Sequence, residues 1–183
     1  MTTTKLTAAE LLTLIEQGRR SFRGATILTD FVWDDIESST TLIDENIDLS
    51  DTTFLGTVDI GDLHILGELN FARATFAGRC ALYRMQIKQI NAEGALFHRG
   101  LGLVNATIKA ALFARACFAE DTTCHPNGLV IKQTTGALLD LTDAWSPATI
   151  LECDFDTVIH ATAELGRRTP RFLSEMLTEQ KEA

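Results

Sequence analysis

The chain has 183 residues, of which 45% are hydrophobic, and a formal net charge of −9 at pH 7. This length supports one sizeable core, and the negative charge disfavours general attraction to nucleic acid or anionic lipid. Because no run reaches the roughly 18 apolar residues of a membrane span, and the N-terminus lacks the basic start and apolar block of a secretion signal, we expect a cytoplasmic protein.

The first predicted element is a short helix from about Ala8 to Gln17. Thr7 and Glu10 have the spacing of a capping box, and Gly18 suits the left-handed conformation that ends many helices. We expect residues 1–21 to cap the N-terminal end of the fold that follows. The apolar stripe of the helix consists of Leu11, Leu12, Leu14 and Ile15.

Beyond Phe22 the helical period gives way to a repeat of 21 residues, which separates Phe76, Phe97 and Phe118. Apolar anchors recur within it in steps of five, five, five and six residues, a pattern that neither a helix nor a flat strand produces. We expect the anchors to form an inward-facing ladder. Its predicted members are Leu66, Phe71, Phe76, Leu82, Ile87, Phe97, Leu103, Ile108, Phe113 and Phe118.

A small residue usually lies two positions before each anchor, as Ala95 does before Phe97. Alternation of a large and a small inward side chain suits the narrow interior of a solenoid. Four five-residue sides would make one square coil, and successive coils would stack at about 4.8 Å. An antiparallel β-sandwich or a parallel helix of another repeat class is the alternative architecture.

Two segments show a more specific repeat unit: "NIDLSDTTF" around Leu49 and "LLDLTDAW" around Leu141. This unit resembles that of the pentapeptide-repeat family, which reads small residue, Asp or Asn, Leu or Phe, and two variable residues. The head, "AAELLTLIEQGRRSFRGATI", resembles the helix and first turn that open such proteins. The resemblance implies an all-β solenoid, a right-handed parallel β-helix of about six coils, over residues 22–145. Many units lack the Asp or Asn, Ala92 replaces a large anchor, and "EDTTCHPNG" resembles an insertion.

Residues 146–183 break the repeat. Pro170 stands at the first turn of a second predicted helix. We expect this partly helical segment to cap the open C-terminal coil, because solenoid ends must be shielded. Homodimerisation, which the resemblance implies for the C-terminal region, is a compatible role. The residues concerned are Phe172, Leu173, Met176 and Leu177.

Charge is segregated along the repeat. Between Gly24 and Ala72 there are eleven acidic residues and no Lys or Arg, whereas from Arg73 to Lys132 there are eight basic and three acidic residues. An acidic surface favours docking to a basic partner, and the alternative is a solvated surface that maintains solubility. The candidate partner-binding residues are Asp30, Asp34, Asp35, Asp44, Glu45, Asp48 and Asp51.

Basic residues of the middle coils are expected on several sides. Lys88 and Lys109 share one outward line, whereas Arg84 and Arg99 belong to other sides. Phosphate backbones are best tracked by a single basic stripe. We therefore expect no direct binding of nucleic acid.

No motif of a catalytic or cofactor site is present, neither a nucleophile elbow, nor a phosphate loop, nor a metal-binding helix. We therefore expect no catalytic residue, cofactor or metal. The four cysteines lack zinc-finger spacing. The one alternative is a soft metal site made by Cys124, His125, Cys153 and His160.

The leading hypothesis is a non-enzymatic protein–protein interaction module that presents a rigid acidic β-helix surface to a protein partner. The alternative follows from the resemblance, because quinolone-resistance pentapeptide-repeat proteins bind DNA gyrase. It implies a DNA-mimic inhibitor or protector of a DNA-handling enzyme.

Overall fold

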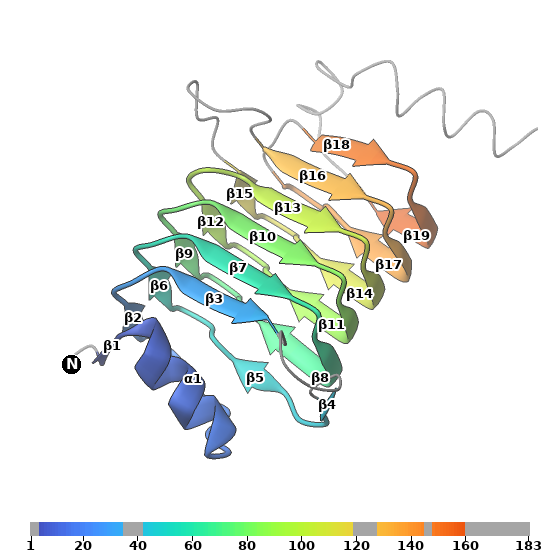
Figure 1. Cartoon of the computed structure of the whole chain (residues 1–183). Helices are drawn as coiled ribbons and strands as arrows, with labels where there is room; N and C mark the ends of the chain where they lie inside the picture. Colours follow the sequence, from blue (N-terminus) through green and yellow to red (C-terminus); the bar gives the residue numbers. More distant parts are fainter. Residues whose placement is uncertain (1–3, 35–41, 119–127, 145–147, 160–183) are drawn as a thin grey trace, which may run out of the picture.

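A computed structural model describes residues 4–34, 42–118, 128–144 and 148–159 of the chain. These residues form a parallel β-solenoid with one short helix, α1 (Ala8–Glu16), at the N-terminal end (Figure 1). Three sheets of six, six and seven strands make three sides of the coils, and all their strand pairs are parallel. The predicted solenoid of about six coils is confirmed. Its predicted range of 22–145 is too short, because the strand Lys5–Leu6 precedes it and the strands Ala148–Leu151 and Asp154–Ile159 continue two of the sheets beyond it.

Each sheet takes one strand from most coils. The first sheet contains β1 (Lys5–Leu6), β2 (Thr26–Ile27), β6 (Thr53–Phe54), β9 (Thr75–Phe76), β12 (Leu96–Phe97) and β15 (Cys117–Phe118). The second contains β3 (Phe31–Asp34), β7 (Val58–Gly61), β10 (Cys80–Tyr83), β13 (Leu101–Val104), β16 (Leu129–Lys132) and β18 (Ala148–Leu151). The third contains β4 (Leu42–Ile43), β8 (His64–Asn70), β11 (Gln86–Asn91), β14 (Thr107–Leu112), β17 (Thr135–Asp140) and β19 (Asp154–Ile159), with β5 (Ile47–Asp48) paired to β8.

A column of stacked phenylalanine rings runs through the interior behind the first sheet. The ring centroids of Phe54 and Phe76 are 4.9 Å apart, those of Phe76 and Phe97 4.6 Å, and those of Phe97 and Phe118 4.9 Å. These separations follow from the spacing of hydrogen-bonded strands, because each ring lies on equivalent positions of neighbouring coils. Burial of each ring stabilises the fold by about 1.5–3 kcal/mol.

Leu66 was predicted to belong to the ladder, and this prediction is wrong. Ile65 pairs with Ile87 and Glu68 with Gln89, so β8 carries one more residue than β11 at this point. Such a bulge sets two residues opposite one; it leaves Ile65 fully buried and Leu66 49% exposed. The other nine ladder residues are buried: Phe71, Phe76, Leu82, Ile87, Phe97, Leu103, Ile108, Phe113 and Phe118.

Two corners of the coils use the left-handed backbone conformation, which costs roughly 1–2 kcal/mol for a residue other than glycine. Stacked coils hydrogen-bond both sides of these corners and so hold them in place; for example, the N–H of Asp51 donates to the carbonyl of Ala72. One corner is formed by Gly24, Asp51, Arg73, Gly94, Arg115 and Asp143. The other is formed by Asp62, Arg84, Asn105, Gln133 and Glu152.

An Asp or Asn side chain precedes the first of these corners in four coils. In each, the side-chain oxygen accepts a hydrogen bond from the backbone N–H two residues later, which is an Asx turn. The four donor–acceptor distances are 2.8–3.1 Å. This gives the repeated Asp or Asn a physical role, since it starts the turn by which the chain leaves the third sheet. The residues are Asp48, Asn70, Asn91 and Asp140.

Helix α1 covers part of the N-terminal end of the solenoid (Figure 1). The predicted capping box is confirmed, because the side chains of Thr7 and Glu10 each accept a hydrogen bond from the other's backbone N–H. Leu11 and Ile15 are buried against the core, and Gly18 has a φ of 90°. No described segment forms a helix with the length and apolar character that a membrane crossing needs. The predicted C-terminal helix, with Phe172, Leu173, Met176 and Leu177, lies outside the described residues.

Candidate functional site

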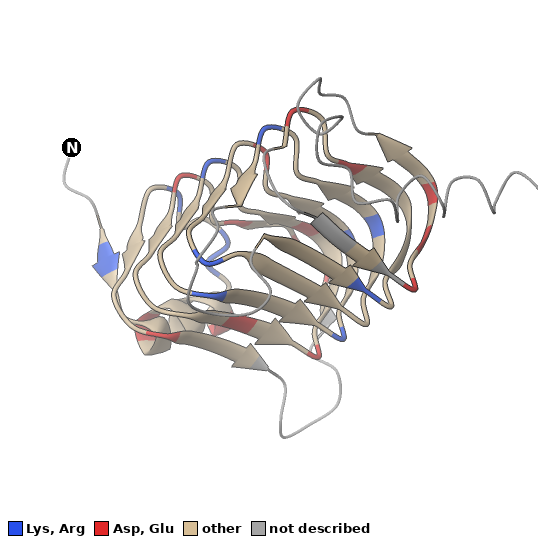
Figure 2. Cartoon of the chain, turned by 90° about the horizontal axis from the view of Figure 1, so that it is seen from above, with Lys and Arg blue, Asp and Glu red and all other residues tan. Residues whose placement is uncertain are grey.

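The acidic residues of the N-terminal coils are spread over several sides of the solenoid. Charged residues sit mainly at the turns between strands, while the strands themselves are mostly uncharged (Figure 2). Of the candidate partner-binding residues, Asp34 is the last residue of β3 and Asp35 lies outside the described residues. The remaining candidates divide into residues that hold the coils together and residues that are exposed at the N-terminal end.

Asp51 bridges three coils through two arginines. Arg73, 22 residues later, forms a bidentate pair with it, with Nε–Oδ1 and Nη2–Oδ2 distances of 2.7 and 2.8 Å. Arg23 in the preceding coil donates from Nε to Oδ2 at 2.9 Å. Hydrogen bonds from Arg73, and then from Arg23, hold the pKa of the Asp51 carboxyl below its usual value.

The same arrangement recurs at the other left-handed corner. Arg84 forms a bidentate pair with Asp62, which lies 22 residues earlier, and this pair lowers the pKa of the Asp62 carboxyl. At the first corner, Arg115 likewise pairs with Glu93, which lies 22 residues earlier. Some of the acidic residues of the N-terminal coils are therefore paired with arginines of the neighbouring coils.

Asp30 and Asp48 also serve the backbone. An oxygen of Asp30 accepts a hydrogen bond from the N–H of Thr57 at 2.8 Å, and this bond lowers the pKa of the Asp30 carboxyl. The Asp48 carboxylate accepts hydrogen bonds from the Ser50 N–H at 3.0 Å and the Asn70 side chain at 3.3 Å. Both carboxylates therefore accept hydrogen bonds within the chain, although Asp30 is exposed and Asp48 is half-buried.

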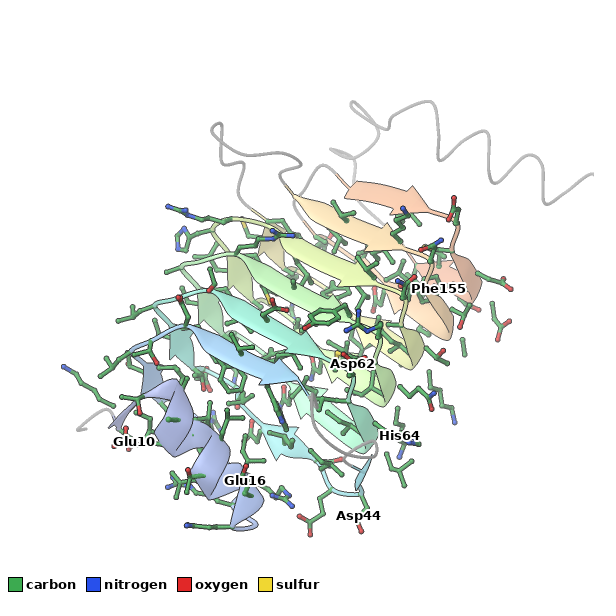
Figure 3. The ribbon with its side chains drawn as sticks, viewed as in Figure 1. Glu10, Glu16, Asp44, Asp62, His64 and Phe155 are labelled. Carbon is green, nitrogen blue, oxygen red and sulfur yellow. The ribbon has the colours of Figure 1, made fainter. Side chains whose placement is uncertain are left out.

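Asp44 and Glu45 remain as exposed candidates. Glu45 pairs with Arg20 at 2.7 Å, but its side chain keeps 59% of its surface exposed. Glu16, at the end of α1, is exposed as well. In Figure 3, Glu16 and Asp44 lie at the same N-terminal end of the solenoid. We name Glu16, Asp44 and Glu45 the acidic end.

Acid titration should reveal the structural role of Asp51. Since its folded-state pKa lies below the unfolded value of about 3.9, its pairs stabilise the fold above that pH, and this contribution is lost as pH falls through the folded-state pKa. We expect Asp51→Asn, which tolerates the left-handed backbone, to lower the unfolding free energy at pH 7 by about 0.2–1 kcal/mol per lost pair and to flatten its acid dependence. Urea unfolding at pH 7 and pH 3 measures both. An unchanged pH dependence would contradict this role.

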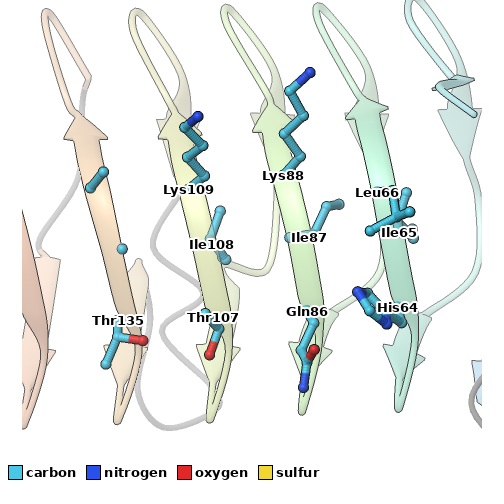
Figure 4. Close-up of a pocket in the computed structure, with 12 residues that line it drawn as sticks. His64, Ile65, Leu66, Gln86, Ile87, Lys88, Thr107, Ile108, Lys109 and Thr135 are labelled. Carbon is cyan, nitrogen blue, oxygen red and sulfur yellow. The ribbon is translucent and has the colours of Figure 1, made fainter. Parts of the chain in front are cut away.

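A second feature is an open trough of about 530 Å³ on the outer face of the third sheet, across β8, β11, β14 and β17 (Figure 4). Outward side chains on either side of the inward-facing Ile65, Ile87 and Ile108 form its two walls. The first wall consists of His64, Gln86, Thr107 and Thr135. The second consists of Leu66, Lys88, Lys109 and Ala137.

Lys88 and Lys109 are exposed side by side in the second wall. The pairing of Ile87 with Ile108 and of Gln89 with Ala110 places them in register, as the sequence predicted. Sequence analysis missed the trough itself. A signal for it existed, because a polar residue recurs one position before each of the inward residues Ile65, Ile87 and Ile108.

The thiol of Cys80 is structural. Cys80 is buried, and burial first, then the charge of Asp59, raises the pKa of its thiol far above the usual range. A thiol held neutral in this way is inert. No three His, Cys, Asp or Glu side chains of the described ranges are placed to hold a metal ion. Cys124, His125 and His160, three residues of the alternative metal site, lie outside those ranges.

Comparisons of the chain with protein-family models, curated proteins and solved structures found no match. The functional assignment therefore depends on the two surfaces described above, the acidic end and the trough.

Proposed function

We propose that this chain is a non-enzymatic interaction module that docks a protein partner through its acidic end. The observation that carries the proposal is the placement of the acidic residues: Asp48 and Asp51 are half-buried and bind other parts of the chain, whereas Asp44 and Glu45 are exposed at the N-terminal end, where Glu45 keeps most of its surface exposed beside Arg20. The exposed carboxylates lie at one end of a stack of hydrogen-bonded coils. A surface of this kind suits a basic partner.

Rigidity and charge would act together at such a surface. The coils are fixed by parallel strand pairing and by the phenylalanine column, so docking would cost little ordering entropy. Exposed carboxylates would steer a basic partner during encounter and would make its association depend on salt. The segment that follows β4 would give this surface its shape, and Asp44 and Glu45 would give it its negative charge.

Membership of the pentapeptide-repeat family and a cytoplasmic location are parts of this proposal. The Asx turns support the family, because they give the Asp or Asn of its repeat unit a defined position at one corner of the coil.

Duplex mimicry of a DNA-handling enzyme's substrate is the alternative, and the net charge of −9 supports it. Two observations make the solenoid less like the polyanionic surface of DNA. Asp51 and Asp62 are neutralised by bidentate pairs with arginines, and Lys88 and Lys109 are exposed. A supercoiling assay with DNA gyrase distinguishes the two functions. Inhibition or protection by the wild type, lost on neutralising the acidic end, would favour mimicry.

Affinity capture from host lysate tests the proposed function. Wild-type protein is compared with Glu16→Gln/Asp44→Asn/Glu45→Gln, which keeps side-chain size and removes three charges. We expect a basic protein to be recovered with the wild type and lost with the variant. Asp30→Asn is the matched control, because it removes an acidic charge that serves the backbone and should leave the recovered proteins unchanged.

A further inference from the structure

We propose that the trough of the third sheet binds an extended acidic peptide segment of a protein partner, with Lys88 and Lys109 as the charge-recognition residues. This surface lies outside the acidic end and has the opposite sign. It is therefore a second docking surface, and it does not depend on the first.

The dimensions of the trough suit a short extended chain. It crosses four neighbouring strands, so its length is about 14 Å at the usual spacing of 4.7–4.9 Å between strands. An extended peptide advances about 3.3 Å per residue, so four or five residues fill it. The hydroxyl and amide groups of Gln86, Thr107 and Thr135 line one wall and can both donate to and accept from a peptide backbone.

The charges of the second wall define the ligand. Lys88 and Lys109 stand on adjacent strands, about 4.8 Å apart along the sheet. Neither forms a salt bridge with any residue in the described part of the chain. Two neighbouring ammonium groups repel each other, and a pair of ligand carboxylates would replace this repulsion with attraction.

The residues on either side of the two lysines favour a ligand with only a short acidic segment. Leu66 and Ala137 adjoin them on the two sides, and Asp156 lies in register with Ala137 one strand further on. Leu66 is 49% exposed and offers an apolar contact. A phosphate backbone that continued beyond the trough would meet Asp156, which disfavours a long polyanion such as nucleic acid. The ligand that fits has an apolar residue followed by two acidic residues at alternate positions, whose side chains lie on the same side of an extended chain.

Fluorescence anisotropy with a labelled peptide of sequence LETEA measures this binding, and the neutral peptide LQTQA is the ligand control. We expect Lys88→Ala/Lys109→Ala to weaken LETEA binding about tenfold, the effect of two partly exposed ion pairs. Lys132→Ala is the matched protein control, because Lys132 is an exposed lysine on the second sheet. Circular dichroism confirms that each variant is folded.

Charge reversal makes the test specific. We expect Lys88→Glu/Lys109→Glu to bind the basic peptide LKTKA more tightly than LETEA. The variant Glu16→Gln/Asp44→Asn/Glu45→Gln should bind LETEA with the affinity of the wild type. Equal binding of LETEA by the wild type and the double alanine variant would overturn the proposal. Tighter, lysine-dependent binding of a single-stranded oligonucleotide or heparin than of LETEA would also overturn it. Failure of LETEA to bind the wild type at millimolar concentration would do the same.

Discussion

Replacement of Phe97 by alanine is expected to destabilise the protein by about 3–5 kcal/mol, and replacement by aspartate to prevent soluble folding. Phe97 is 1% exposed and stacks on Phe76 on one side and Phe118 on the other. Its removal interrupts the column in the middle, between coils whose spacing is set by strand pairing. A domain is stable by only about 5–15 kcal/mol. The free-energy cost of burying an unpaired carboxylate at this position is therefore enough to unfold the protein.

Leu66→Ala is the matched control for the phenylalanine column. Leu66 was predicted inside and lies on the outer face, so its truncation should change the unfolding free energy by no more than about 0.5 kcal/mol. Urea unfolding followed by circular dichroism gives both values. A Phe97→Ala protein with an unchanged midpoint would show that the column is not where the structure places it.

Gly136→Ala is expected to destabilise the C-terminal coils by about 1–3 kcal/mol, the usual cost of overpacking. A Cβ atom at Gly136 would lie 2.0 Å from the carbonyl oxygen of Ile108 and 2.9 Å from Cε1 of Phe155. The strands β14, β17 and β19 would have to separate. Since solenoid stability is a sum of contacts between neighbouring coils, the damage should stay near the C-terminal end.

Hydrogen exchange by mass spectrometry separates local from global damage. We expect faster exchange in β17 and β19 and unchanged protection in β8 and β11. Gly102→Ala is the control, because a Cβ atom there meets no atom within 4 Å. That change should be neutral or stabilise by up to about 1 kcal/mol. Equal exchange in the two variants would contradict the close approach at Gly136.

The sequence was informative where structure follows from local repetition. The stacking of Phe76, Phe97 and Phe118 depends on a constant spacing of 21 residues and the capping box of α1 on a spacing of three, and both were predicted. The prediction for Leu66 was wrong because the repeat of 21 residues places Leu66 beneath Ile87. The bulge in β8 lengthens this interval to 22 residues, so Ile65 takes the inward position. A one-residue slip in a strand moves a side chain to the opposite face.

The candidate site was predicted only in part. The acidic block was identified from its composition, but composition does not show which carboxylates have partners. Asp51 meets Arg73 because their coils stack at an offset of 22 residues, so the pairing depends on exact coil lengths. The trough depends on two rows of outward side chains on four neighbouring strands, whereas the sequence showed only the line of Lys88 and Lys109.

The proposed function is tested most directly by the dissociation constant of the captured partner for wild-type protein and for Glu16→Gln/Asp44→Asn/Glu45→Gln, measured at low and high salt. We expect the variant to bind about tenfold more weakly at low salt, with the difference shrinking as salt screens the exposed charges. Equal dissociation constants for the two proteins at low salt would show that the acidic end is not the docking surface.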